Sequence, residues 1–167
     1  MRDSTTTPCV LFPELFGRPL TAQFDLPNAS SDGGAVLLKA ADRRLGLIAR
    51  LASALVDGRQ SGKVRHGLGD LLGQRIYGLA LGYEDANDAA RLADDPIHKL
   101  LLERDPICGE ALASQPTLSR FENDVSRGEL KAMGEALFAT VLERHRRRRR
   151  KVRRITVDLD VTDDPTH

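Results

Sequence analysis

Residues 130–144, LKAMGEALFATVLER, decide the fold class of this chain. Their apolar side chains recur at i, i+3, i+7, i+8, i+11 and i+12, the spacing of one face of an α-helix: Leu130, Met133, Leu137, Phe138, Val141 and Leu142. Similar spacing predicts helices over 36–45, 47–55 and 68–80, and Pro96 and Pro116 are expected to open two more. We therefore predict a helical body over residues 31–150.

Directly after this last helix the hydrophobic period changes from helical to alternating. In ITVDLDV, residues 155–161, every second residue is apolar, as in a strand with one apolar face. Residues 1–30 are expected to be irregular except for a short strand over 20–26. That strand is a candidate partner for 155–161, because a lone strand leaves its backbone groups without hydrogen bonds. The predicted fold class is mainly α.

The composition indicates a soluble protein whose core is made of packed helices. Hydrophobic residues make up 41% of the 167 positions but aromatic residues only 4%, so the core is expected to be rich in Leu and Ala. No apolar run approaches the roughly 20 residues of a membrane span, and no signal peptide opens the chain. Cys9 and Cys108 show no metal or disulfide spacing. We expect a cytoplasmic protein with no membrane partner.

Positive charge is concentrated in one segment, RHRRRRRKVRR, residues 144–154. It holds nine of the 25 Lys and Arg residues and no acid. One alternative is a helix end, where cations interact favourably with the helix dipole, but that effect needs far fewer charges than this. Another alternative is a localisation tract. We favour contact with the phosphates of DNA. The predicted DNA-binding residues here are Arg144, Arg146, Arg147, Arg148, Arg149, Arg150, Lys151, Arg153 and Arg154.

A second candidate for DNA contact is the segment LASQPTLSRFEN, which is typical of the second helix of a helix-turn-helix. The residues near the start of such a helix reach base edges in the major groove, here Gln115, Thr117, Ser119 and Arg120. The alternative is an ordinary packed helix held by Leu118 and Phe121. None of the histidines has a partner at metal-ligand spacing, and we predict surface positions for His66, His98 and His145.

The predicted strand at 155–161 carries a candidate metal site. Alternation places Asp158 and Asp160 on one face, roughly 7 Å apart. Two such carboxylates repel unless a cation or solvent keeps both ionised, and Mg²⁺ binds through one or two carboxylates together with substrate phosphates. The alternative is an edge strand whose exposed acids resist aggregation.

Taken in order, these segments resemble the bacterial insertion-sequence transposases of the DDE class, transposase DDE domain group 1. The resemblance runs from about residue 20 to 167 and is carried by SSDGGAVLLKAADRRLGL, VRHGLGDLLGQRIYGLALGYEDANDAARLADDP, LASQPTLSRFEN and ITVDLDVTDDPTH. It implies a helical N-terminal region followed by an RNase-H-like α/β domain that cuts and joins the DNA ends of the element with Mg²⁺ or Mn²⁺. It also implies that Asp160, or failing that Asp158, is the first catalytic and metal-binding aspartate, and that the protein lies at the nucleoid.

The family's second aspartate and its glutamate have no counterpart in this chain. We therefore expect residues 151–167 to be the first strand of an incomplete catalytic domain, with no activity and no firmly held metal in this chain alone. One alternative is a non-catalytic DNA-binding module or regulator. Another is a fragment of a haloacid-dehalogenase-like phosphatase, with Asp158 as nucleophile and Asp160 as general acid. Self-association is an open alternative beside DNA as a partner.

Overall fold

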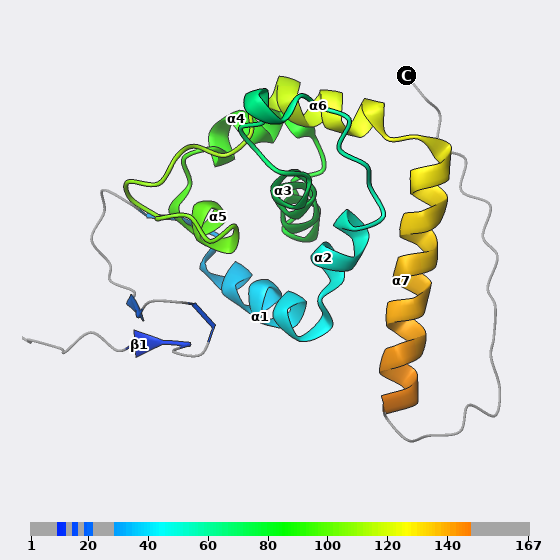
Figure 1. Ribbon diagram of the computed structural model, residues 1–167. Coiled ribbons are helices and arrows are strands. Elements are labelled where there is room, and N and C mark those ends of the chain that lie inside the picture. The colour runs from blue at the N-terminus through cyan, green and yellow to red at the C-terminus, as the bar shows by residue number, and fades with distance from the viewer. Residues whose placement is uncertain (1–9, 13–14, 17–18, 22–28, 148–167) are drawn as a thin grey trace, which may run out of the picture.

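The structure is a computed structural model that describes residues 10–12, 15–16, 19–21 and 29–147 (Figure 1). The elements in this part of the chain are β1 (Val10–Leu11), β2 (Leu20–Thr21), η2 (Gly33–Ala35), α1 (Val36–Leu45), α2 (Leu47–Ala52), η3 (Ser61–Lys63), α3 (Leu68–Ala80), η4 (Ala86–Asp88), α4 (Ala89–Leu92), α5 (Pro96–Leu101), α6 (Gln115–Asp124) and α7 (Arg127–Arg147). The helical body predicted for this region is confirmed. The predicted strand at 155–161 lies outside the described residues and stays a prediction.

The N-terminal strands differ in part from what the sequence indicates. A strand begins at Leu20 as predicted, but it pairs antiparallel with β1, so that Val10 lies opposite Thr21 and Leu11 opposite Leu20. Residues 10–11 were expected to be irregular, and that expectation is wrong. Two residues are too few to show a period, and β1 forms because β2 needs a partner for its backbone groups.

Local signals set the helix boundaries. Gly46 separates α1 from α2 and adopts φ +63°, which a residue with a Cβ adopts only at a cost. After α3, Gly82 at φ +90° ends the helix in a Schellman motif, in which the Tyr83 N–H donates to the Gly78 carbonyl at 2.9 Å. The Asp95 carboxylate caps α5 by accepting from the N–H groups of two residues in its first turn.

The core surrounds α3, which the other short helices enclose (Figure 1). Leu71 faces α4 and α6, where it packs with Ala89, Ala113 and Leu118. Two further clusters of buried residues join η2 and α1 to α3 and α5, and they contain Leu15, Phe16, Val36 and Leu100 in one, and Ala35, Tyr77 and Leu101 in the other. Leu and Ala predominate, as the composition predicts.

Helix α7 stands to one side of this body and packs mainly against α2 (Figure 1). Thr140 is its single buried residue. The apolar stripe that identifies this helix in the sequence is largely exposed, with Leu130 56% and Phe138 63% accessible. A stripe of this kind normally faces a core. In the described part of the chain, the periodicity therefore predicts the helix correctly but not what covers it.

Two glutamates of α7 fasten it to the region around α2. Near its start, Glu129 accepts hydrogen bonds from the N–H groups of Val56 at 2.9 Å and Ser126 at 2.8 Å. The Glu129 N–H donates in turn to the Ser126 hydroxyl oxygen at 3.3 Å, so that S-x-x-E forms a capping box. Near the other end, Glu143 binds Arg50 of α2 at 2.7 Å. Polar contacts at both ends thus hold α7 in place, although the helix buries little apolar surface.

No helix in the described ranges is long and apolar enough to cross a membrane.

Candidate nucleic-acid interface

The basic segment predicted to bind DNA begins inside α7. Arg144, Arg146 and Arg147 occupy its last turn, and all three are exposed. Their charge lies at the negative end of the helix dipole. The remaining predicted contacts lie outside the described residues: Arg148, Arg149, Arg150, Lys151, Arg153 and Arg154.

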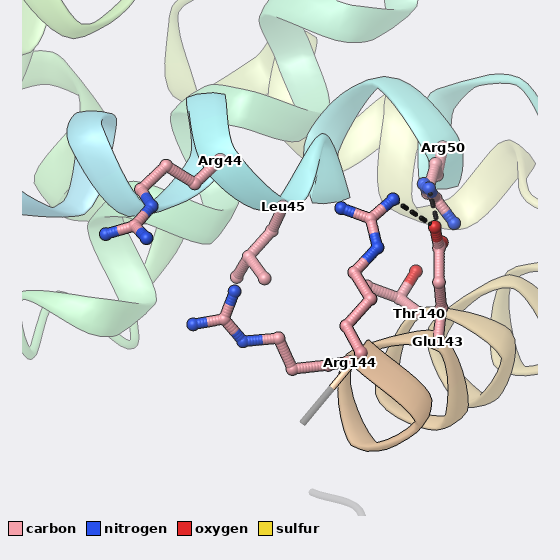
Figure 2. A pocket seen from close by; sticks show the side chains of 7 residues that line it. Arg44, Leu45, Arg50, Thr140, Glu143 and Arg144 are labelled. Atoms are coloured by element: carbon pink, nitrogen blue, oxygen red, sulfur yellow. Dashed lines mark hydrogen bonds and ion pairs between the residues drawn. The ribbon is translucent and has the colours of Figure 1, made fainter. Parts of the chain in front are cut away.

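Two arginines that the sequence analysis did not select lie beside this end of α7. A hollow of about 40 Å³ is lined by Arg44 at the end of α1 and Arg50 of α2, together with Arg144 and Arg147 of α7. In Figure 2 the side chains of Arg44 and Arg50 extend from the α1–α2 side, and that of Arg144 extends from α7. The hollow is therefore basic, and three helices build it.

Glu143 is the acidic residue of this hollow. Its carboxylate accepts from Arg50 through one oxygen and from Arg147 through the other. These hydrogen bonds, with that from Arg50 the larger, hold the pKa of Glu143 below its ordinary value. Glu143 is thus ionised at neutral pH and neutralises part of the positive charge that surrounds it.

Helix α6, the candidate recognition helix, is packed as an ordinary helix on one face. Leu118 is 2% exposed in the core, and Phe121 packs against the same cluster. On the other side, Arg120 is exposed, and its Nε donates to the Pro116 carbonyl at 3.0 Å. Gln115, Thr117 and Ser119 are half-buried.

The connection before α6 differs from a helix-turn-helix. In that motif a turn of about three or four residues joins the two helices. Here α5 ends at Leu101 and α6 begins at Gln115, and the intervening segment packs Leu112 and Ala113 into the core. The proposal that α6 reads base edges therefore rests on its residue types.

A groove of about 1040 Å³ separates α6 from the connection between α2 and α3. Thr117 and Arg120 line one wall. The opposite wall carries Arg59, Lys63 and Arg65, but Asp57 holds Arg59 through two hydrogen bonds of 2.7 and 2.6 Å. Asp124 and Glu129 also line the groove, so its charge is mixed. The end of α7 is the more basic surface.

Two of the segments that carry the family resemblance meet His98 of α5 in one polar cluster. Asp32, from SSDGG, accepts from the Tyr83 hydroxyl at 2.9 Å and lies 2.8 Å from His98 Nε2. Tyr83 belongs to GYEDAND, and its ring contacts His98 edge-on with centroids 5.7 Å apart. Burial opposes ionisation of Asp32, but its hydrogen bonds outweigh that effect and lower its pKa. The cluster thus ties the segment before η2 and the segment after α3 to α5.

The surface positions predicted for two histidines are wrong. His98 is 2% exposed in the cluster with Asp32, and His66 is 7% exposed. The Nδ1 of His66 lies 2.9 Å from Nη2 of Arg104, which also contacts Asp70. Both rings are buried because a hydrogen-bond partner from a distant segment satisfies them, which spacing along the chain cannot show. His145 is exposed as predicted.

The predicted metal-binding aspartates, Asp158 and Asp160, lie outside the described residues, so their fit to a cation stays a prediction. Among the residues that are described, no three His, Cys, Asp or Glu side chains lie close enough together to hold a metal ion.

The sequence shows little that would select Arg44 and Arg50 as candidates. Both belong to ordinary amphipathic helices, where isolated arginines usually face solvent. Arg44 adjoins Arg43 in the last turn of α1, which is a common place for cations. Only the packing of α7 against α2 brings them beside Arg144.

Comparison with known proteins gives one match that bears on this arrangement. No curated protein and no solved structure matches the chain. The family model described as transposase DDE domain group 1 matches residues 12–167, which includes both the helical body and the Asp158–Asp160 segment. The chain belongs to this family of transposases.

Proposed function

We propose that the described helical region is the DNA-binding part of a DDE transposase that cuts and joins the ends of an insertion sequence. The single observation that carries this is the basic end of α7, where exposed arginines lead directly into the arginine-rich segment. Family membership supplies DNA as the polyanion. The arginine-rich segment 144–154 supports binding to DNA with little sequence preference, because contacts to phosphates carry no sequence information.

Helix α6 is the second part of the proposed DNA contact. The exposure of Arg120 and the position of Gln115 at the start of the helix support this part of the proposal, since both residue types form hydrogen bonds with base edges. Such contacts add sequence preference to the binding that the arginines supply. Replacing Arg120 by Ala should lower the preference for the element's own ends and leave binding to unrelated DNA nearly unchanged.

The catalytic part of the proposal concerns Asp160, with Asp158 as the alternative. In the complete enzyme, carboxylate oxygens from one of them would hold Mg²⁺ or Mn²⁺, which suits hard divalent cations. The metal would stabilise the attacking and leaving oxygens of the phosphodiester. Within this chain, those two residues are the ones that match the family's catalytic pattern.

The test of DNA binding is a salt titration of the purified chain with labelled duplex DNA, followed by fluorescence anisotropy. The logarithm of affinity should fall linearly with the logarithm of salt concentration, with a slope of about −0.9 per phosphate contact. Replacing Arg146, Arg147, Arg148, Arg149 and Arg150 by Ala should flatten that slope. Replacing the same five by Lys preserves the charge and should largely restore it. Absence of binding at low salt, or equal slopes for all three proteins, would contradict the proposal.

The second candidate function is a DNA-binding regulator without catalysis, which the helical region and the arginines support equally well. A phosphatase is less well supported, since the family match spans the helical region as well as the aspartates. Assays for strand cleavage, strand joining and aryl-phosphate hydrolysis with Mg²⁺ and Mn²⁺ separate the phosphatase from the other two.

A further inference from the structure

A cleft between the α1–α2 turn and the second half of α7 contains two adjoining hollows. The smaller, of about 40 Å³, is the arginine-lined one of Figure 2. The larger, of about 400 Å³, has mostly apolar walls that include Leu47 and Val141. Arg44 and Arg144 line both hollows. Arg44 and Arg144 therefore lie at the boundary between the arginine-lined hollow and the apolar one.

The charges in this cleft are only partly neutralised. Glu143 binds Arg50 and Arg147, and no other acid in the described part of the chain lines either hollow. Within the described part of the chain, neither Arg44 nor Arg144 forms an ion pair or a side-chain hydrogen bond. Two guanidiniums that have no carboxylate partner among the described residues line a single small hollow, an arrangement that an anion would stabilise.

We propose that Arg44 and Arg144 clamp one backbone phosphate of DNA. The planar guanidinium matches phosphate in geometry and can donate two parallel hydrogen bonds to it. The apolar hollow alongside suits the deoxyribose that adjoins a phosphodiester better than it suits a free, fully hydrated phosphate ion. This clamp rests on the proposed DNA-binding function and extends it from the α7 tract to α1.

Continuity along the helix explains why the anion is DNA and not an isolated ligand. Arg144 lies one turn before Arg147, and in the sequence the basic segment continues after Arg147. A strand of DNA that contacts the last turn of α7 would lie beside the cleft, because Arg144 and Arg147 both line it. Glu143 keeps Arg50 and Arg147 in place, so α7 stays against α2 and Arg144 stays beside the hollow that Arg44 also lines.

The test compares Arg44→Ala, Arg144→Ala and the double variant in the salt titration. Arg127→Ala is the matched control, because Arg127 is an exposed arginine at the opposite end of the same helix. Arg44→Ala should weaken binding about five- to tenfold at low salt and reduce the slope by about 0.9, the value of one phosphate contact. The double variant should lose no more slope than either single one, because both residues serve the same phosphate.

The shape of the guanidinium group gives a further test of the same site. Arg44→Lys keeps the charge but loses the planar fork, and should recover only part of the affinity. Thermal unfolding of every variant checks that α7 stays folded.

The outcomes distinguish the clamp from the function on which it rests. If the unaltered chain does not bind DNA, both proposals fail. If it binds and Arg44→Ala behaves like Arg127→Ala, the clamp alone is overturned. Additive loss of slope in the double variant would show two separate phosphates, and would likewise overturn the shared clamp.

Discussion

The side chains of Asp32 and His98, 66 positions apart in the chain, meet at 2.8 Å between Oδ2 and Nε2. Tyr83 donates to the same carboxylate oxygen. His98 is 2% exposed and the side chain of Asp32 13%, so the contact forms largely out of water. A buried polar group that loses its partner is costly, which makes this cluster a sensitive point of the helical body.

Replacing His98 by Ala should lower the free energy of unfolding by about 2 kcal/mol, because Asp32 loses a partner and a cavity forms. Tyr83→Phe removes one hydrogen bond at a less buried position and should cost about 1 kcal/mol. His145→Ala is the control, since His145 is exposed at the end of α7. Urea unfolding followed by circular dichroism measures all three. Equal stability of the His98 and His145 variants would contradict this role of the cluster.

Stability should fall as the pH drops below about 6.5, the ordinary pKa of histidine. Burial, followed by the positive charge of Arg104, lowers the pKa of His66 in the folded protein. The unfolded chain therefore takes up the proton first, and acidification favours unfolding. The stabilisation is complete above the unfolded pKa and is lost progressively toward the lower folded value. His66→Gln should flatten the dependence of the unfolding midpoint on pH in that window. An unchanged slope would show that another group is responsible.

Glu129→Ala should loosen the first turns of α7. Its hydrogen bonds, of which that from the Ser126 hydroxyl has the largest effect, lower the pKa of Glu129 to about 2. The contact is therefore kept at every pH above that value and is lost only as the pH falls toward it. Hydrogen exchange should become faster at residues 127–131 in the variant. Glu135→Ala, an exposed position in the same helix, is the control and should leave the exchange pattern unchanged.

Gly82→Ala should destabilise the protein by about 1 kcal/mol, because an Ala at φ +90° is strained. Gly69 gives the matched comparison in α3. A Cβ there would meet no atom within 4 Å, and Ala is the better helix former. Gly69→Ala should therefore stabilise by up to about 1 kcal/mol. Thermal unfolding compares the two variants, and the same sign for both would contradict the Schellman geometry.

The 167-residue chain assayed alone should neither cleave nor join DNA with Mg²⁺ or Mn²⁺. Two-metal catalysis needs ligands from several elements to hold ions about 3.5–4 Å apart, and Asp158 and Asp160 adjoin on one predicted strand. Activity that disappears in Asp160→Ala but persists in Asp158→Ala would contradict this prediction. Hydrolysis of an aryl phosphate that both variants lose would favour the phosphatase alternative.

The sequence by itself determined most of the helix boundaries. The predicted span of 68–80 is that of α3, and Gly46 and Gly82 end helices where expected. These features depend on contacts between residues that are close in the chain, so residue type and spacing are enough to predict them. The concentration of arginines after residue 143 is likewise a property of the sequence alone, and it predicts DNA binding without reference to the fold.

Only the tertiary structure decided which residues act together. The burial of His98 depends on Asp32, and the position of Arg44 beside Arg144 depends on α7 packing against α2. The same packing left Phe138 exposed although its spacing is that of a core residue. Such outcomes follow from contacts between segments far apart in the chain. Local periodicity fixes the direction in which a side chain leaves its helix, but not what lies opposite it.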